Sequence, residues 1–363
     1  MDAATTPRSL IRHARPHRSA LRLFLSLLLI VLFGCDANPP EAPAPRFVTE
    51  LSETLVAAEL GLEGAVLSLW SAGDESTWFA GGTSSESGGF VLRYSQNTIR
   101  PENIPAGPLL WWITGANQEH LWAVGDRGRI LARGPDGWVD ETPTLDEKAI
   151  LYGAWAAATD DVWAVGGSIR RGGPKGLVLR SRGDGAWERI SDDAFPDDLN
   201  LYKVWGRGPD DVFLVGEGGV VIHWDGEQFS RQDTGHSSLL FTVHGQKDGL
   251  TLAVGGLMRA AAFSEDGSQW TGEFPEGAPG LNGVFVRSDG MAVATGNRGA
   301  TLVRTENGRW YPVRPRDAAD IGGRTLHAVW SDETTWAVGG DLSSMSDGVI
   351  LTTRRPVPRV EME

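Results

Sequence analysis

One unit of strand and turn signals recurs seven times from residue 66 onward. Each copy contains a short apolar strand that ends in glycine, as V-W-A-V-G or a close variant. Successive glycines lie 39 to 50 residues apart. A strand-rich repeat of about this length is typical of propellers, in which each repeat folds into one blade. The seven glycines are Gly81, Gly125, Gly166, Gly216, Gly255, Gly296 and Gly339.

The copy at residues 201–229 shows what one unit contains. It reads L-Y-K-V-W-G, R-G-P-D-D, V-F-L-V-G, E-G-G, V-V-I-H-W and D-G-E-Q-F, which predicts four antiparallel strands joined by tight turns. The strands are apolar without strict alternation, as expected for sheets that are buried on both faces. We therefore predict an all-β fold, a seven-bladed β-propeller with four antiparallel strands per blade, over residues 46–355, and a C-terminal tail at 356–363.

Most of the 15 tryptophans occupy repeat positions. The first strand of most copies ends in an aromatic residue, and the fourth strand begins with one. We expect these rings to be buried between neighbouring blades, where flat sheets must interlock. The first-strand positions are Trp70, Thr114, Trp155, Trp205, His244, Phe285 and Trp330, and the fourth-strand positions are Trp138, Trp187, Phe229, Trp270 and Trp310.

The last copy lacks a fourth strand of its own. It ends in T-T-R-R-P-V-P, without the D-G-x-x-W pattern, whereas R-F-V-T-E-L at residues 46–51 is similar to R-W-Y-P-V at 309–313. We expect this N-terminal segment to supply the outer strand of the last blade, because a free sheet edge is a template for aggregation.

The N-terminus has the features of an export signal. Five arginines precede or enter the apolar run at residues 21–33, which is followed by Leu32-Phe33-Gly34-Cys35. The run is shorter than the ~20 residues that span a bilayer. The segment resembles the lipobox of bacterial lipoproteins, so we predict a signal peptide at 1–34, lipidation of Cys35, and a tether at 35–45 that is rich in Pro and Ala. The alternative is a transmembrane anchor in which Cys35 is incidental.

The turn that leads into the fourth strand has a motif of its own. Ser264-Glu265-Asp266-Gly267-Ser268-Gln269-Trp270 is one residue short of an Asp-box, and D-G turns before other fourth strands are looser matches. The units resemble the Asp-box or BNR-like repeats of the sialidase-type propellers, a superfamily that includes photosystem II assembly and stability factors and many bacterial envelope lipoproteins. The resemblance implies a fold and not a reaction, because these boxes are structural.

Catalytic and metal-binding groups are not visible in the pattern. The four tyrosines all occupy repeat positions, so none stands out as the nucleophile of a sialidase. Asp160-Asp161 and Asp210-Asp211 are possible paired carboxylates for glycoside hydrolysis, but both precede the same strand in successive copies, where turn-forming Asp is common. The histidines lack the spacing of metal ligands. We predict no catalytic residue, no metal and no cofactor.

Three loops depart from the repeat. The hairpin after Gly166 is enlarged and basic, with Arg170, Arg171 and Lys175, and is a candidate contact for an anionic partner. The loop at 191–198 is acidic with one aromatic that we expect to be exposed, Phe195, and is a candidate contact for a basic partner or a divalent cation. A long polar hairpin lies at 341–347. Propellers commonly bind through such loops, although a solvated loop remains the simpler interpretation of each.

The net charge of −14 disfavours nucleic acid as a partner. We expect an exported monomer, held by its lipid at the bacterial cell membrane or outer membrane. The predicted function is that of a non-catalytic binding or scaffolding lipoprotein that recognises an envelope protein through propeller loops. The alternatives are a carbohydrate-binding or glycoside-hydrolase-like propeller and, less favoured, a propeller that carries a cofactor.

Overall fold

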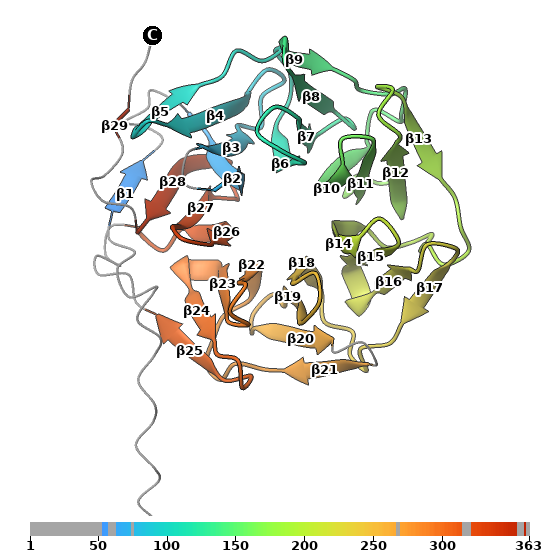
Figure 1. Cartoon of the computed structure of the whole chain (residues 1–363), viewed down its shortest axis with the longest axis vertical. Helices are drawn as coiled ribbons and strands as arrows, with labels where there is room; N and C mark the ends of the chain where they lie inside the picture. The colour runs from blue at the N-terminus through green and yellow to red at the C-terminus, as the bar shows by residue number, and fades with distance from the viewer. Residues whose placement is uncertain are drawn as a thin grey trace, which may run out of the picture. The chain divides into compact units, whose positions relative to one another are not determined.

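The computed structural model arranges seven sheets as blades around a central axis (Figure 1). It describes residues 53–56, 63–73, 76–265, 269–313, 321–353 and 359–360. Six of the sheets have four strands and one has five, and within each sheet consecutively numbered strands pair antiparallel. The predicted seven-bladed propeller is therefore confirmed. We number its blades 1 to 7 in chain order, starting from the blade that contains β2.

The first strand of each blade lies beside the axis and the fourth lies at the rim (Figure 1). The first strands are β2 (Ala65–Ser71), β6 (Leu110–Gly115), β10 (Ile150–Ala158), β14 (Leu201–Gly208), β18 (Leu240–Gly245), β22 (Leu281–Val286) and β26 (Thr325–Ser331). The second strands are β3 (Ser76–Gly82), β7 (Leu121–Gly125), β11 (Asp161–Gly167), β15 (Asp211–Gly216), β19 (Thr251–Gly255), β23 (Ala292–Gly296) and β27 (Thr335–Asp341).

The outer half of each blade follows the same order. The third strands are β4 (Gly89–Ser95), β8 (Ile130–Gly134), β12 (Leu177–Ser181), β16 (Val221–Trp224), β20 (Ala261–Glu265), β24 (Thr301–Arg304) and β28 (Ser346–Thr352). The fourth strands of blades 1 to 6 are β5 (Thr98–Pro101), β9 (Gly137–Asp140), β13 (Trp187–Ile190), β17 (Phe229–Gln232), β21 (Trp270–Glu273) and β25 (Trp310–Val313). Two short 3-10 turns, η3 (Glu217–Gly219) and η4 (Asn297–Gly299), follow second strands.

Blade 7 is closed by the strand β1 (Glu53–Val56), which pairs antiparallel with β28. An N-terminal strand thus completes the last blade, as predicted. The strand lies a few residues after the expected segment 46–51, which is outside the described residues. A second terminal strand, β29 (Arg359–Val360), pairs parallel with β5 and makes blade 1 five-stranded.

The repeat glycine, at or near the end of each second strand, is required by a close approach. It pairs with the first-strand residue just before a β-bulge. The carbonyl oxygen of the residue that precedes this partner lies against the Cα of the glycine. A Cβ at Gly125 would lie 2.0 Å from the carbonyl oxygen of Leu109, and at Gly255 it would lie 1.8 Å from that of Leu239. Any other residue would have to displace the backbone, which explains why the repeat is marked by glycine.

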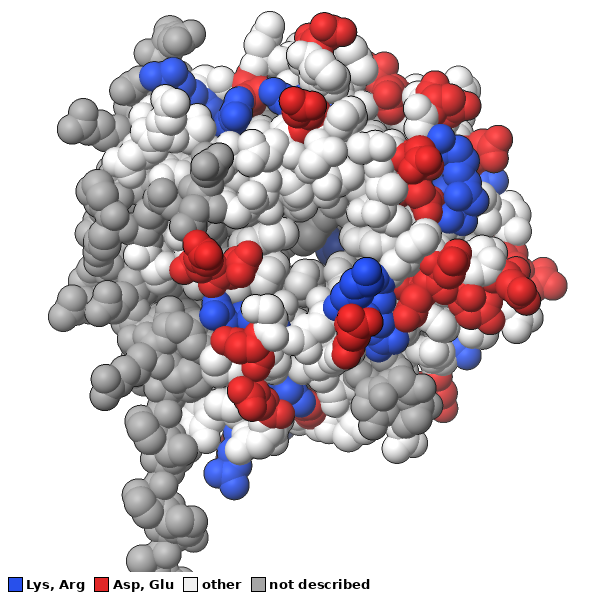
Figure 2. All heavy atoms as spheres, in the orientation of Figure 1, with Lys and Arg blue, Asp and Glu red and all other residues white. Residues whose placement is uncertain are grey.

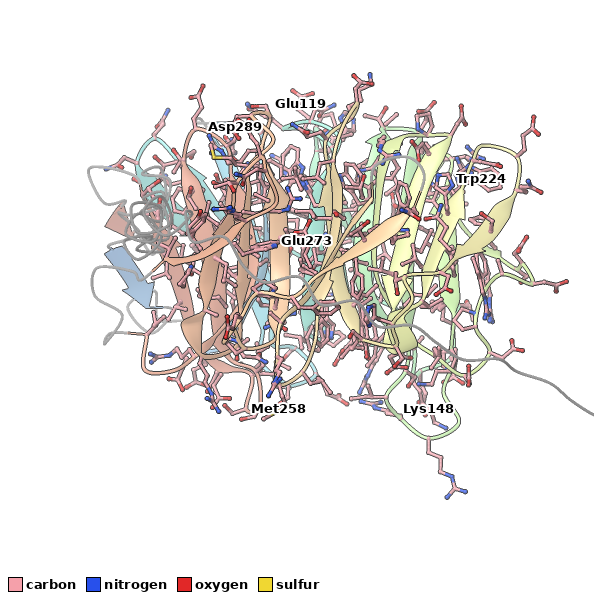
Figure 3. The ribbon with its side chains drawn as sticks, turned by 90° about the horizontal axis from the view of Figure 1, so that it is seen from below. Glu119, Lys148, Trp224, Met258, Glu273 and Asp289 are labelled. Carbon is pink, nitrogen blue, oxygen red and sulfur yellow. The ribbon has the colours of Figure 1, made fainter. Side chains whose placement is uncertain are left out.

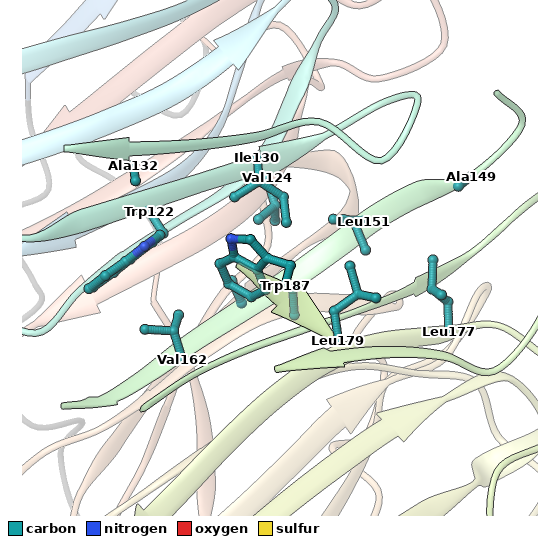
Figure 4. Packing of buried hydrophobic residues seen from close by; sticks show 12 residues of the cluster. Trp122, Val124, Ile130, Ala132, Ala149, Leu151, Val162, Leu177, Leu179 and Trp187 are labelled. Atoms are coloured by element: carbon teal, nitrogen blue, oxygen red, sulfur yellow. The ribbon is translucent and has the colours of Figure 1, made fainter. Parts of the chain in front are cut away.

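The hydrophobic core is divided into clusters that lie between neighbouring blades. Figure 4 shows the cluster between blades 2 and 3, in which Trp122 and Val124 of one blade face Leu151, Leu179 and Trp187 of the next. Further clusters join the other neighbouring pairs, including blades 7 and 1. The predicted burial of aromatic residues between blades is confirmed for these rings.

The fourth-strand tryptophans also link the blades through their indole nitrogens. Trp310 Nε1 donates to Glu273 Oε2 at 2.7 Å, and Trp270 Nε1 donates to Gln232 Oε1 at 2.7 Å. Each acceptor lies at the end of the preceding blade's outer strand. A buried N–H requires such a partner, so the repeat carries both the donor and the acceptor.

The D-G turns before the fourth strands are held by aspartate. Asp225 Oδ1 accepts the backbone N–H groups of Glu227 and Gln228 at 2.9 and 2.8 Å, and these hydrogen bonds hold the pKa of Asp225 below its ordinary value. The turn that most resembles an Asp-box includes residues 266–268, which lie outside the described residues.

The predicted signal peptide, Cys35 and tether also lie outside the described residues. Within the part of the chain that is described, no helix is long and apolar enough to cross a membrane.

Candidate functional site

The bulge in each first strand turns one extra side chain toward the axis. In blade 2 the register skips Trp111 between Leu110 and Trp112, and the same shift recurs two residues into every first strand. A bulge of this kind re-aims a side chain away from the ladder. The seven residues that it projects are Leu67, Trp111, Tyr152, Tyr202, Phe241, Asn282 and His327.

Six of the seven bulge residues line one cavity of about 300 Å³ at the axis, which we call the cup. Their rings pack around its wall in chain order. The ring centroids are 5.7 Å apart for Trp111 and Tyr152, 5.1 Å for Tyr152 and Tyr202, and 5.4 Å for Tyr202 and Phe241. These spacings fall within the range of favourable aromatic contacts. The volume lies at the lower end of that of small-molecule sites, about 300–1,000 Å³.

The polar atoms of two wall residues are fixed by hydrogen bonds to carboxylates that lie outside the lining of the cup. Trp111 Nε1 donates to Asp126 Oδ1 at 2.8 Å, and Tyr202 Oη donates to Glu217 Oε1 at 2.9 Å. Burial and the nearby carboxylate raise the pKa of Tyr202, which therefore stays a neutral donor. Tyr152 is different, because its buried hydroxyl has no hydrogen-bond partner among the described residues.

Lys203 lies where the cup narrows toward the centre of the ring. Its side chain lines both the cup and a second cavity of about 140 Å³, and the residue is only 3% exposed. The Nζ atom donates to the carbonyl oxygen of Tyr152 at 3.2 Å and lies 3.1 Å from the ring centroid of Trp112. None of the described carboxylates forms an ion pair with it.

The sequence around Lys203 explains how a lysine fits there. It follows the bulge residue Tyr202, and the corresponding residue of blade 3 is Gly153. Burial lowers the pKa of Lys203 well below its ordinary value. The face of Trp112 favours the ammonium form and partly opposes that shift. The protonation of the Lys203 amine is therefore sensitive to any charge placed beside it.

The second cavity lies on the other side of Lys203. Its wall includes the first-strand aromatics, such as Trp155, Trp205 and Trp330. The Trp155 ring covers Gly206 of the next blade, where a Cβ would lie 2.7 Å from the ring. These first-strand rings pack against the clusters between blades, but they are only partly buried, because they also border the channel. Figure 2 looks onto this face, where the centre of the ring is hollowed and basic atoms lie at depth.

Exposed apolar side chains surround the mouth of the cup. Ile169 is 76% exposed and Leu257 is 65% exposed, and both line the cavity, while the adjacent Met258 is 81% exposed. They come from the hairpins that join second to third strands in blades 3 and 5. Leu342 and Met345, from the hairpin of blade 7, complete the lining. We call these five residues the collar. Figure 3 places Met258 and Lys148 on one face and Glu119 and Asp289 on the other.

Three of the predicted binding residues lie beside the cup. Arg170 and Arg171 are exposed on the hairpin that carries Ile169, and Lys148 Nζ donates to the carbonyl oxygen of Arg171 at 3.3 Å. Lys175 Nζ lies 3.9 Å from Glu217 Oε2, and Glu217 in turn holds Tyr202. The polar hairpin at 341–347 supplies two collar residues.

Phe195 does not lie on the surface, as its polar loop had suggested. Its ring is buried in the core between blades 3 and 4 and packs against Phe229 with a centroid distance of 4.8 Å. An apolar ring in an acidic loop folds inward because burial removes its surface from water. We correct that expectation and leave Phe195 out of the proposed surface.

The second aspartate of each acidic pair is engaged in structural contacts. Asp161 accepts two hydrogen bonds from Arg180, at 2.7 and 2.8 Å, and Arg180 lies over the ring of Trp163. Asp211 contacts His223 at 2.7 Å and Arg207 at 3.2 Å. No Asp or Glu is among the described residues that line the cup. Within the described ranges there is also no group of three or more residues suited to a metal ion.

Sequence reasoning missed Lys203 and most of the cup. Six of the seven copies carry an uncharged residue directly after the bulge, and only the copy L-Y-K-V-W-G carries a lysine. Comparison of this one position across the copies would have singled it out. The bulge itself leaves no signal besides the glycine opposite it, so the repeat looked like a continuous strand.

Comparison with known proteins shows a partial likeness. No family model matches the chain. It is 28% identical over 156 residues to the photosystem II assembly lipoprotein Ycf48 of Nostoc sp. (strain PCC 7120), a match that covers 42% of this chain and 40% of that protein. The chain therefore spans well under half the length of that relative.

Solved structures with the same fold are more distant in sequence. A structure described as YCF48 bound to D1 peptide matches with a TM-score of 0.51 at 13% identity, over 68% of this chain and 92% of that one. The WD40 propeller domain of Doa1 matches with a TM-score of 0.64 at 11% identity, over 85% of this chain and 98% of that one. At such low identity these likenesses speak for the propeller fold alone.

Proposed function

We propose that this protein is a non-catalytic binding lipoprotein of the bacterial cell envelope, which recognises a protein partner at the cup and its collar. The observation that carries the proposal is the gathering of Ile169, Leu257 and Met258, all strongly exposed, at the mouth of an aromatic-lined cavity. Contiguous exposed apolar surface around a pocket is typical of interaction sites.

The residue types of the cup suit recognition of a protein segment. Trp and Tyr are the most frequent energetic anchors of interfaces, because they bury a large area at little cost in conformational entropy. Here Trp111, Tyr152 and Tyr202 are held by the ring of blades, and the side chains of Trp111 and Tyr202 are also fixed by hydrogen bonds to Asp126 and Glu217. A preorganised wall lowers the entropic cost of binding.

The basic hairpin adds a polar rim to this apolar centre. Arg170 and Arg171 are exposed beside Ile169 on a chain whose net charge is −14. A local basic group on an acidic body favours a partner with an acidic residue next to its apolar segment, and such rim charges mainly steer association.

The similarity to other proteins supports a binding role. The Nostoc relative is named an assembly lipoprotein, and one structural neighbour is a propeller bound to a peptide. In this proposal, the lipid on Cys35 and the tether hold the propeller in the envelope, and the Asp-box-like turns are part of its scaffold.

The experiment is site-specific photo-crosslinking in the native envelope, with the reactive residue at Met258 or, as a matched control, at Val139. Val139 is a half-exposed apolar residue on the outer strand β9. We expect a discrete partner to crosslink from position 258 only, and Leu257→Glu to abolish that product while Val139→Glu leaves it unchanged. Identical products from both positions, or a product insensitive to Leu257→Glu, would overturn the proposal.

A further inference from the structure

Two polar groups in the cup lack the partners that burial demands. Lys203 is 3% exposed and Tyr152 is 9% exposed, and both line the cavity. The lysine has a carbonyl oxygen and a ring face as neighbours, with no carboxylate among the described residues in ion-pair range. The tyrosine hydroxyl has no hydrogen-bond partner there. Buried groups of this kind are usually paired, and exceptions call for an explanation.

The packing of the ring does not require either group. At the position of Lys203 the other blades carry Ser68, Trp112, Gly153, Thr242, Gly283 and Ala328, and they form the same sheet. At the position of Tyr152, blade 5 carries Phe241, which packs into the same wall without a hydroxyl. The fold is thus compatible with apolar residues at both places.

We propose that the cup binds a carboxylate carried on a slender apolar or aromatic body, with Lys203 and Tyr152 as the groups that hold the carboxylate. The amine would supply the positive charge, and the tyrosine hydroxyl would donate a hydrogen bond to an oxygen. The rings of Trp111, Tyr202 and Phe241 would enclose the apolar body. This inference rests on the proposed function in that it uses the same cup.

The charge balance favours a monoanion. The lining of the cup holds one lysine and no carboxylate, so Lys203 matches a single negative charge. The carboxylates of Asp126 and Glu217 lie behind Trp111 and Tyr202, and their negative charge disfavours a dianion. The other titratable groups of the wall are Tyr152, Tyr202 and His327. Burial raises the pKa of both tyrosines and lowers the pKa of His327 to about 4, so all three are neutral at pH 7.

Binding of a carboxylate is then coupled to proton uptake by Lys203. In the empty cup burial lowers the pKa of Lys203, and an adjacent carboxylate favours the ammonium form. When the carboxylate enters, the fraction of Lys203 that is neutral in the empty cup takes up a proton from the buffer, and the resulting pair is ammonium and carboxylate. Up to one proton is bound per ligand, and no bond is made or broken in the ligand.

The test compares an acid with its amide in the full-length protein. The probes are 4-phenylbutanoate and 4-phenylbutanamide, which share an apolar body, measured by isothermal titration calorimetry in two buffers of different ionisation enthalpy. We expect the acid to bind at least tenfold more tightly than the amide, with a buffer-dependent enthalpy that reports proton uptake. Lys203→Met should abolish both the preference and the uptake, and Tyr152→Phe should weaken acid binding several-fold without affecting the amide.

Lys247→Met is the matched control, because Lys247 is exposed and lies outside the lining of the cup. It should leave all values unchanged. A second pair of probes, acetyl-Ala-Leu-Phe with a free or an amidated C-terminus, tells whether a chain end or a free acid is preferred. A tighter free-ended peptide indicates a chain end, and a tighter 4-phenylbutanoate indicates a small acid.

Equal binding of acid and amide by the wild type, or a preference that survives Lys203→Met in a variant with an unchanged melting temperature, would overturn the inference. Crosslinking from Met258 separates this outcome from failure of the proposed function. A partner that still crosslinks to Lys203→Met uses the collar without the carboxylate site. If the wild type shows neither a preference for the acid nor a crosslinked partner, the cup has no binding role.

Discussion

Gly153 of blade 3 faces Lys203 of blade 4 so closely that a Cβ at residue 153 would lie 3.0 Å from the Cα and 3.1 Å from the Cδ of the lysine. The same Cβ would lie 2.7 Å from the carbonyl oxygen of Tyr202. The place of Lys203 beside both cavities therefore depends on the absence of a side chain in the neighbouring blade.

Replacement of this glycine tests that dependence. We expect Gly153→Ala to lower the free energy of unfolding by about 1–3 kcal/mol, because a methyl group in a filled space forces the backbone to shift. Urea denaturation measures the change. Gly208→Ala is the matched control, since a Cβ there meets nothing within 4 Å. An equal effect of the two substitutions would contradict the packing described here.

Two partly buried histidines should make the fold sensitive to acid. His244 accepts the backbone N–H of Val286 at its Nδ1 atom, and burial lowers its pKa to about 3 and that of His327 to about 4. An unfolded histidine has a pKa of about 6.5. Below that pH the unfolded state binds more protons, so stability is fully present above pH 6.5 and falls as the pH drops toward 4.

The slope should approach about 1.4 kcal/mol per pH unit for each histidine within that window. His244→Asn keeps an acceptor but removes the titrating group, so it should flatten the dependence while lowering stability at pH 7. The control is His120→Asn, on a surface turn. Thermal melts across pH 4–7 measure the dependence of stability on pH. If its slope is unchanged in His244→Asn, His244 is not a source of the acid sensitivity.

Phe195 should matter for stability rather than for binding. Its ring is buried against Phe229, so Phe195→Ala should cost about 3 kcal/mol through lost burial and a cavity. Phe274 is half-exposed, and Phe274→Ala should cost less than about 1 kcal/mol. Chemical denaturation of both variants tests the contrast. Similar losses would mean that the loop at 191–198 is not anchored by its aromatic residue.

Lipidation of Cys35 is testable without structural data. Cells grown with an alkyne analogue of palmitate should label the wild type, and Cys35→Ala should lose the label and leave the membrane fraction. Ser26→Ala, within the apolar run, is a control that should retain both. Membrane retention of unlabelled Cys35→Ala would favour the transmembrane alternative instead.

The fold was predictable because its strongest constraint is local. The position opposite each bulge has no room for a side chain and must be glycine. Glycine therefore recurs in the sequence once per blade. The fourth-strand tryptophans were predictable for a similar reason, since each needs both a buried place and an acceptor for its N–H. The closing strand was predicted in kind but not in position, because pattern alone does not determine which of two adjacent β-prone segments pairs with β28.

The site was harder to predict, because its residues are repeat positions. Tyr152 and Tyr202 are repeat positions of the first strand, and only the bulge directs them to the axis. Tyr152 and Tyr202 were discounted as site residues because they occupy equivalent positions in successive copies. Equivalent positions of successive blades face the same axis, so this recurrence places both residues in the wall of the cup. Phe195 shows the opposite error, since a polar neighbourhood in sequence does not decide whether an aromatic ring is exposed.

The pairing of β1 with β28 gives the ring a mechanical seam. Among the described residues, a pull on the chain from its N-terminal side first meets the four residue pairs from Glu53–Thr352 to Val56–Val349. Backbone hydrogen bonds in such a ladder run perpendicular to the strands. Tension along the strand shears them together, whereas tension across the sheet opens them one at a time. Resistance of the whole ring to force is thus set by the direction in which this one strand is pulled.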